Sequence, residues 1–176
     1  MLIRETGFIG LKVIEPEVFK DERGFFLETF QTTRYKNQGI SEEFVQDNQS
    51  FSSRGVLRGL HFQLKQPQAQ IVTVLSGRIF DVCVDIRKDS RTFGKWFGIE
   101  LSDQGPRQIY MAPGFAHGYC VLSDHANLHY KVSSEYDPSD QSGIIWNDPD
   151  IDISWPDFEY IVSPKDLGFK KFRDVI

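Results

Sequence analysis

The chain has 176 residues and a formal net charge of −5 at pH 7. This acidic balance argues against a nucleic-acid partner, because binding to a phosphate backbone relies on a basic surface. No segment approaches the ~20 apolar residues that a membrane span requires, and the N-terminus lacks the features of a signal peptide. We therefore expect a cytoplasmic protein without a membrane partner, folded as a single domain over residues 1–176.

Apolar and polar residues alternate with period two along most of the chain, which predicts many short strands. In chain order the predicted strands are Phe8–Ile14, Gly24–Phe30, Glu43–Ser50, Val56–Gln63, Gln70–Leu75, Ile79–Arg87, Trp96–Leu101, Gln108–Met111, Gly118–Leu122 and Leu128–Ser133. Helical signals are limited to Thr32–Gln38 and to a short helix capped by Ser163. This all-β pattern favours a sandwich or a barrel, with the tail from Ser154 packed over the sheets.

Cysteine usage and one strongly alternating strand indicate an ordinary apolar core. Cys83 and Cys120 lie in valine-flanked strand segments, which favours buried, reduced thiols. The segment Ile79–Arg87 alternates apolar residues with Asp81, Cys83, Asp85 and Arg87, which predicts a strand with one face in the core.

Three other strands place polar side chains on faces that their apolar neighbours mark as interior. Glu28 shares the parity of Phe26 and Phe30, and Arg58 shares that of Leu60 and Phe62. In Glu43–Ser50, the side chains that share the parity of Phe44 are Gln46, Asn48 and Ser50. Burying such groups without partners is costly, so these faces predict a barrel lumen that binds a polar ligand.

Two histidines are candidates for chemistry. His61 lies within the strand Val56–Gln63, where a positioned imidazole can act as a base near neutral pH. His117 follows a Pro-Gly turn in a segment similar to the second motif of cupins, which often bind metals. The first cupin motif is incomplete, because Phe62 and Gln63 follow His61 without a second histidine. A metal site built from His61, His117 and Glu28 is therefore an alternative and not the expectation.

Two further residues have both a structural and a chemical interpretation. Tyr130 shares the parity of Leu128 and Val132, so its hydroxyl is expected to point inward, where a phenol can donate a proton. Asp166 stands in the first turn of the short helix after Ser163, where an acid caps the helix or orients the imidazole of His61.

With these residues in view, the chain resembles the dTDP-4-dehydrorhamnose 3,5-epimerase family. The resemblance extends from about residue 8 to about residue 168 and rests on seven blocks in family order. The blocks are Asp21–Phe26, Gln46–Asn48, Gly55–Gln63, Thr92–Trp96, Pro113–Gly118, Trp146–Pro149 and Lys165–Asp166. It implies a cupin-type double-stranded β-helix (jelly roll) with short peripheral helices, and a homodimer that exchanges N-terminal strands. It also implies an enzyme with no metal and no organic cofactor.

The resemblance further implies roles for individual residues. The residue matching His61 removes the proton next to the C4 ketone of a 4-keto-6-deoxyhexose, the one matching Tyr130 returns a proton from the opposite face, and the one matching Asp166 holds the imidazole. The residues that line the sugar and diphosphate site are Arg23, Glu28, Gln46, Asn48, Arg58, His117 and Lys165. Tyr136 is implied to stack on the nucleobase, which leaves dTDP-linked and CDP-linked sugars both open.

Two positions in the expected site depart from the family pattern. Gln70 stands where the family usually carries a lysine, so a neutral amide replaces the cation near the developing enolate. Gln141 stands where the family carries a glutamate. Charged donors form hydrogen bonds about twice as strong as neutral ones, so the first change bears on the rate of the reaction.

These observations favour a cofactor-independent isomerase that inverts C3 and C5 of a nucleotide-linked 4-keto-6-deoxyhexose. A single-carbon epimerase on a related dTDP- or CDP-keto sugar is one alternative. A homologue that binds a sugar nucleotide without catalysis is another, and the glutamine at position 70 is the main argument for it.

Overall fold

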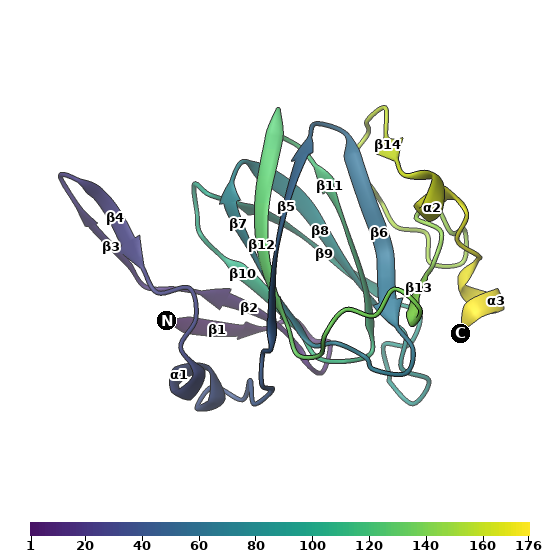
Figure 1. Ribbon diagram of the computed structural model, residues 1–176, viewed down its shortest axis with the longest axis horizontal. Coiled ribbons are helices and arrows are strands. Elements are labelled where there is room, and N and C mark those ends of the chain that lie inside the picture. The colour runs from purple at the N-terminus through teal and green to yellow at the C-terminus, as the bar shows by residue number, and fades with distance from the viewer.

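A computed structural model describes residues 1–176 and contains two facing antiparallel sheets (Figure 1). The first sheet has, in spatial order, β1 (Leu2–Glu5), β2 (Leu11–Glu15), β10 (Gln108–Met111), β7 (Gln70–Ser76), β12 (His125–Val132) and β5 (Gln46–Ser53). The second has β13 (Gln141–Gly143), β6 (Val56–Gln63), β11 (Phe115–Val121), β8 (Arg78–Asp85) and β9 (Trp96–Ser102), with β14 (Ile161–Val162) parallel to β6. This arrangement confirms the cupin-type jelly roll.

The remaining elements are short and peripheral. Strands β3 (Val18–Asp21) and β4 (Gly24–Leu27) form a separate two-stranded hairpin. The helices are α1 (Thr32–Lys36), α2 (Pro164–Leu167) and α3 (Phe172–Val175), so both predicted helices are confirmed and α3 is additional. No helix in the chain is long and apolar enough to cross a membrane.

The main core fills the space between the two sheets. Its buried side chains come from both layers, for example Val72 and Leu128 from the first sheet and Ile79 and Leu101 from the second. Cys83 and Cys120 are buried and unpaired, as expected, and burial raises the pKa of the Cys120 thiol to about 11. This core occupies part of the barrel and leaves the remainder for polar side chains.

The C-terminal segment covers the outer face of the second sheet. Leu60 and Phe62 of β6 and Val82 of β8 form a second cluster there, against which Trp155 and Phe172 pack. Burial of this face is why the tail after residue 153 is ordered against the sheet, as predicted. The interior face of β8 is covered as well, so Asp81 and Cys83 are fully buried. The prediction that Ile79–Arg87 has one face in the core is therefore incomplete, because both faces of this strand are buried.

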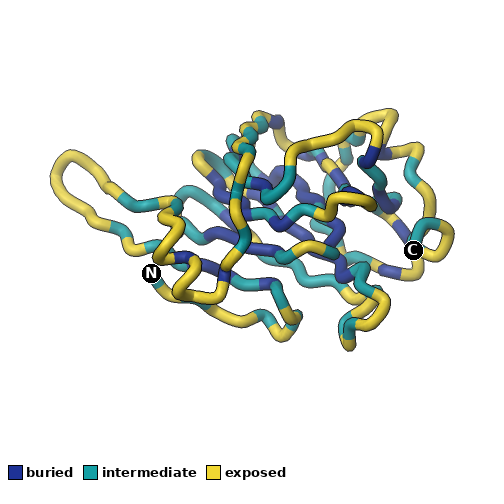
Figure 2. The backbone as a smooth tube through the Cα atoms, turned by 60° about the horizontal axis from the view of Figure 1, so that its bottom comes forward, coloured by how far each residue is buried: buried dark blue, intermediate teal, exposed yellow.

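The hairpin of β3 and β4 projects away from both sheets and is mostly exposed (Figures 1 and 2). Phe25 and Phe26 have 63% and 69% of their surface accessible. The prediction that Gly24–Phe30 presents an interior face is therefore wrong within one chain, because the hairpin pairs only with itself and has no layer beneath it.

Strand β6 changes face part-way along its length. Its pairing with β11 matches Arg58 with Tyr119 and His61 with His117, with a register shift between the two pairs. Gly59 lies at this irregularity, where an added Cβ would meet the Gly118 backbone at 2.5 Å. A bulge of this kind reverses side-chain parity. The prediction that Leu60 and Phe62 share a face with Arg58 is therefore wrong.

Candidate active site

A cavity of about 300 Å³ opens between the two sheets. The side chains that line it are Asn48, Ser50, Arg58, His61, Gln68, Gln70, Val72, His117, Gly118, Tyr119, Leu128, Tyr130, Val132, Tyr136 and Gln141. Polar groups dominate this list, as the sequence predicted for the lumen of the barrel. Eight of the thirteen residues named from the sequence as catalytic or substrate-binding line the cavity, namely Asn48, Arg58, His61, Gln70, His117, Tyr130, Tyr136 and Gln141.

His61 is held by a buried carboxylate at the wall of this cavity. Its Nε2 lies 2.9 Å from Oδ1 of Asp166, and the backbone N–H of Gly59 donates to Oδ2 of the same carboxylate at 3.1 Å. Asp166 is positioned by α2, where its own N–H donates to the Ser163 side chain at 3.1 Å. Asp166 therefore belongs to a capped helix and also orients the imidazole, so the two interpretations left open by the sequence hold together.

The charge of Asp166 fixes which nitrogen of His61 carries a proton. Burial alone would raise the pKa of Asp166, but the hydrogen bond and charge of His61, with the Gly59 and Ser163 hydrogen bonds, hold that pKa below its usual value. A carboxylate accepts hydrogen bonds and donates none, so Nε2 carries the hydrogen in this contact. The second nitrogen, Nδ1, has no protein partner, and its lone pair is free to accept a proton.

His117 forms a second pair of the same type. Its Nε2 lies 2.9 Å from Oδ2 of Asp81, whose side chain is fully buried on β8. The only other polar neighbour of this carboxylate is the thiol of Cys83, with its sulfur 3.8 Å from Oδ1. Sequence reasoning missed Asp81, because alternation placed it with Asp85 and Arg87 on the face opposite the apolar residues.

Tyr130 reaches the cavity from β12, in the sheet opposite His61. Burial raises the pKa of its phenol, as do the nearby Tyr119 and Tyr136, and Arg58 opposes them only in part. The hydroxyl is therefore protonated at neutral pH. Its neighbour Tyr119 is engaged elsewhere, with its hydroxyl 3.0 Å from the hydroxyl of Ser50.

Arg58 and the polar face of β5 complete the interior wall. The Nε of Arg58 donates to the Ser52 hydroxyl at 3.1 Å. On β5, the Gln46 amide donates to Asn48 at 2.7 Å, and its carbonyl oxygen accepts from the Tyr136 N–H at 2.9 Å. The inward orientation predicted for Asn48 and Ser50 is confirmed, whereas Gln46 contacts two cavity residues without lining the cavity itself.

Gln141 connects two other residues of the predicted site, Tyr136 and Lys165. Its Oε1 accepts from the Tyr136 hydroxyl at 2.7 Å and from the Lys165 ammonium. Lys165 is itself exposed and lies just outside the cavity lining. Gln141, which stands where the family carries a glutamate, therefore links the Tyr136 ring to the Lys165 ammonium through hydrogen bonds.

Arg23 and Glu28 do not reach the cavity of their own chain. Arg23 lies at the tip of the exposed hairpin, paired with Asp21 at 2.6 Å. Glu28 follows β4 and pairs with Arg34 at 3.2 Å. No group of three His, Cys, Asp or Glu side chains is arranged to hold a metal ion, and Glu28 does not join His61 and His117.

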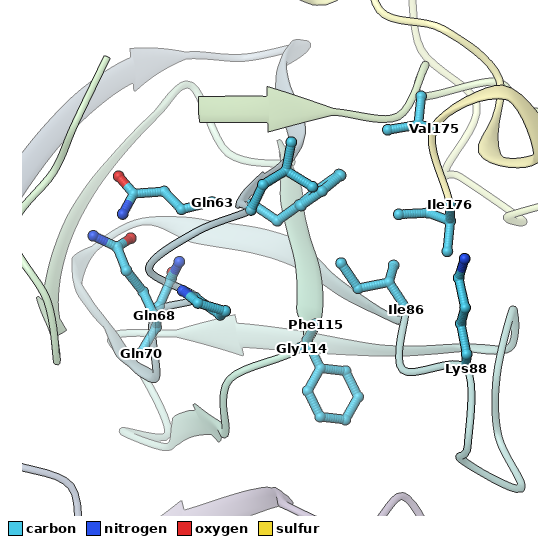
Figure 3. A pocket seen from close by; sticks show the side chains of 12 residues that line it. Gln63, Gln68, Gln70, Ile86, Lys88, Gly114, Phe115, Val175 and Ile176 are labelled. Atoms are coloured by element: carbon cyan, nitrogen blue, oxygen red, sulfur yellow. The ribbon is translucent and has the colours of Figure 1, made fainter. Parts of the chain in front are cut away.

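A neighbouring cavity of similar volume adjoins the first (Figure 3). Gln68 and Gln70 line both cavities, and Ile86 and Ile176 lie on the opposite side of the second (Figure 3). Gln70 therefore stands in the wall between the two cavities.

Comparisons with known proteins place this geometry in context. The family model described as dTDP-4-dehydrorhamnose 3,5-epimerase matches residues 5–174. The chain belongs to this family. It is accordingly an isomerase. The dTDP-4-dehydrorhamnose 3,5-epimerase of Methanothermobacter thermautotrophicus is 49% identical over 173 residues, which cover 97% of this chain and 94% of the relative.

A solved structure and a second relative extend the comparison. The dTDP-6-deoxy-D-glucose-3,5-epimerase of Legionella pneumophila, crystallised with dTDP-4-keto-L-rhamnose, is 47% identical with a TM-score of 0.96. The match covers 99% of this chain and 94% of that one. The dTDP-4-dehydrorhamnose 3-epimerase of Streptomyces niveus is 40% identical over 168 residues, or 94% of this chain and 81% of the relative.

Proposed function

We propose that this isomerase inverts C3 and C5 of dTDP-4-dehydro-6-deoxyglucose to give dTDP-4-dehydrorhamnose. The observation that carries the proposal is the placement of His61 and Tyr130 on opposite sheets around one cavity. An inversion needs a base on one face of the sugar and an acid on the other. A sugar ring seated between the sheets meets that requirement with these two side chains.

The proton transfers follow from the contacts of the two residues. Nδ1 of His61 takes the proton from the carbon next to the C4 ketone, and the C–H electron pair forms a double bond to C4 while the ketone oxygen becomes an enolate. The C=C electron pair of the enolate then takes the proton of the Tyr130 hydroxyl from the opposite face, and the C4 ketone re-forms. The resulting phenolate and the imidazolium of His61 return to their starting states by proton exchange with water. Asp166 stabilises the imidazolium that forms, since its carboxylate already accepts from Nε2.

The remaining side chains of the cavity suit the other parts of the substrate. Arg58 provides donors for the enolate oxygen and the diphosphate, with Gln70 as a neutral donor nearby. His117 lines the same wall, where its Nδ1 can accept a hydrogen bond from the substrate because Nε2 is turned to Asp81. Tyr136, held by Gln46 and Gln141, offers a ring on which a thymine stacks. Lys165 lies beside it at the cavity mouth, where a phosphate group would gain a cation.

The same proposal includes a cytoplasmic homodimer in which the projecting hairpin reaches a second copy. Phe19, Phe25 and Phe26 are exposed on this hairpin, and apolar patches of that kind are typical of interfaces. Arg23 at its tip and Glu28 at its base then act in the cavity of the partner subunit. This accounts for two substrate-binding residues that one chain leaves outside its own site.

Inversion at a single carbon is the second candidate function. Gln70 favours it, because a weaker donor at the enolate lowers the rate of each proton removal. The relative from Streptomyces niveus carries the name of a 3-epimerase, so its name refers to one carbon.

The deciding experiment follows the C3 and C5 protons of dTDP-4-keto-6-deoxyglucose by NMR in deuterated water. We expect enzyme-dependent loss of both signals with the native protein and of neither with His61→Asn. Loss of one signal identifies a single-carbon epimerase. Exchange that survives in His61→Asn would rule out His61 as the base, and no exchange with the folded native protein would overturn the proposed substrate.

A further inference from the structure

One aromatic side chain outside the cavity lining contacts the imidazole of His61. Phe169 follows α2 directly after Gly168, and its ring meets that of His61 edge to face, with centroids 5.5 Å apart and planes at 77°. The Phe169 side chain is half-buried, and it has no part in the proton transfers described above.

The strand opposite Phe169 is shaped to accept its ring. Gly143 of β13 is the register partner of His61. A Cβ added at Gly143 would lie 2.4 to 2.6 Å from three carbons of the Phe169 ring, closer than any real contact. Glycine at this position therefore provides the space in which the ring lies beside the imidazole.

The backbone on both sides of Phe169 is fixed. Its N–H donates to the Asp166 carbonyl at 3.4 Å. Immediately after it, Lys170 forms a parallel bridge with Ile144, and its carbonyl accepts from the Ile145 N–H at 2.9 Å. The ring is thus held between the helix that carries Asp166 and the strand that pairs with His61.

We propose that Phe169 is a positioning residue that restricts rotation of the His61 imidazole. The hydrogen bond to Asp166 fixes the position of Nε2 but leaves the ring able to turn about that contact. The edge contact with Phe169 limits this turn and keeps Nδ1 directed into the cavity. This inference rests on the proposed role of His61 as the base.

The effect on rate follows from the geometry that proton transfer requires. A misplacement of about 1 Å in a reacting group can cost on the order of 10²-fold in rate. For Phe169→Ala we expect kcat for proton exchange to fall by roughly 10- to 100-fold, with KM changed by less than about 3-fold. A change confined to kcat separates positioning of the base from loss of substrate contacts.

A spectroscopic measurement tests the same inference without reference to catalysis. In the native protein the ¹⁵N shifts of His61 should show a hydrogen on Nε2 and a free lone pair on Nδ1. We expect Phe169→Ala to move these shifts toward a mixture of tautomers. Phe169→Leu keeps apolar bulk at the same place, and we expect it to restore most of kcat and of the native ¹⁵N pattern.

Two further variants complete the design. Gly143→Ala leaves Phe169 in the chain but displaces its ring, so it should reproduce the loss of kcat. Phe172→Ala is the matched control, because Phe172 lies on the same tail and packs on Phe93, with ring centroids 5.2 Å apart, without touching His61. We expect Phe172→Ala to lower stability without changing kcat or the His61 spectrum.

Wild-type kcat and an unchanged His61 spectrum in both Phe169→Ala and Gly143→Ala would overturn the inference. The proposed function would stand in that case, provided His61→Asn still abolishes exchange. Exchange that survives in His61→Asn rules out His61 as the base instead, and the ¹⁵N spectrum of Phe169→Ala then still decides whether the ring restrains the imidazole.

Discussion

His61 and His117 face each other across β6 and β11 as register partners, and each imidazole is bound to a separate buried aspartate. The two carboxylates come from different parts of the chain, Asp166 from α2 and Asp81 from β8. Each holds one imidazole nitrogen against the protein, which leaves the other nitrogen available to a ligand. The wall of the cavity thus presents two oriented imidazoles, and the proposed role of His61 as the base follows from this arrangement.

The tautomer of His61 should depend on Asp166. Asp166→Asn replaces an acceptor by a group that also donates, so the imidazole is free to reverse its tautomer. We expect the exchange rate at C3 and C5 to fall by ~10²- to 10⁴-fold with little change in nucleotide binding. The NMR exchange assay measures the rate, and Asp174→Asn, an exposed position on α3, is the control. A native rate in Asp166→Asn would show that the carboxylate serves only the fold.

Tyr130 should separate proton removal from inversion. Tyr130→Phe keeps the ring and removes the hydroxyl. His61 can still take the proton, but no acid returns a proton to the carbon from the opposite face. We expect deuterium to enter the sugar while formation of the inverted product falls by ~10²-fold or more. Tyr160→Phe, outside the cavity, should leave both rates unchanged. Inversion at the native rate in Tyr130→Phe would assign the acid to another group.

Gln70 should limit the rate on the usual substrate of the family. Gln70→Lys introduces a charged donor at the cavity wall, and charged hydrogen bonds are about twice as strong as neutral ones. We expect kcat on dTDP-4-keto-6-deoxyglucose to rise by about 10-fold, which is less than the ~10²–10³-fold cost of removing an oxyanion donor outright because Gln70 already donates. The double variant with Gln141→Glu tests whether the two departures compensate each other. An unchanged or lower rate in both variants would indicate a cavity adapted to a different keto sugar.

The parts of the site that the sequence predicted lie on regular strands. Asn48 on β5 and Tyr130 on β12 are register partners in an uninterrupted ladder, so parity alone gave their orientation correctly. Parity failed on β6, because the irregularity at Gly59 reverses the face of every later residue and places Arg58 and His61 on the same side. Local alternation carries no signal for such a bulge.

Other features depended on contacts between distant segments. Asp81 was assigned to a polar outer face, yet it is fully buried because the second sheet is covered on both sides. Phe169 gave no signal at all, since its contact with His61 is set by where the tail returns to β13. The hairpin that carries Arg23 is exposed because β3 and β4 pair only with each other. The alternation of residues in Gly24–Phe30 did not reveal this.

Mixed dimers should show whether Arg23 acts across subunits. In the proposed homodimer, one subunit supplies His61 and its partner supplies Arg23 to the same cavity. His61→Asn and Arg23→Ala should each be nearly inactive as pure dimers. When the two variants are unfolded, mixed and refolded together, we expect activity to return, because each mixed dimer contains one cavity with both native residues.

The size of the recovery provides the control for this experiment. Random pairing of equal amounts makes about half of the dimers mixed, each with one intact cavity, so roughly one quarter of native activity is expected. Mixing His61→Asn with Asp166→Asn should give no such recovery, because both residues act in the cavity of their own chain and each cavity of a mixed dimer therefore keeps one of the two substitutions. Failure of the His61→Asn and Arg23→Ala mixture to recover would place Arg23 in the cavity of its own subunit or outside catalysis.

The loop between β8 and β9 should control stability in acid. Its centre is the fully buried carboxylate of Asp85, which accepts from Nε of Arg87 at 2.8 Å and from the hydroxyls of Ser90 and Thr92 at 2.6 Å each. Burial alone would raise the pKa of Asp85, but these hydrogen bonds outweigh it and lower the pKa to about 2. An aspartate in an unfolded chain titrates near 3.9, roughly two pH units higher.

Because the pKa of Asp85 is lower in the folded chain, its contribution to stability is present in full above about pH 4 and is lost as the pH falls toward 2. The linkage amounts to about 2–3 kcal/mol of unfolding free energy. We expect Asp85→Asn to be less stable than the native protein at pH 7 and to lose less stability on acidification, as measured by urea unfolding from pH 7 to pH 2. Asp124→Asn, which removes an exposed ion pair with Arg54, should change stability by less than about 1 kcal/mol. Parallel pH profiles for the native protein and Asp85→Asn would show that the loop gains its stability from neutral contacts.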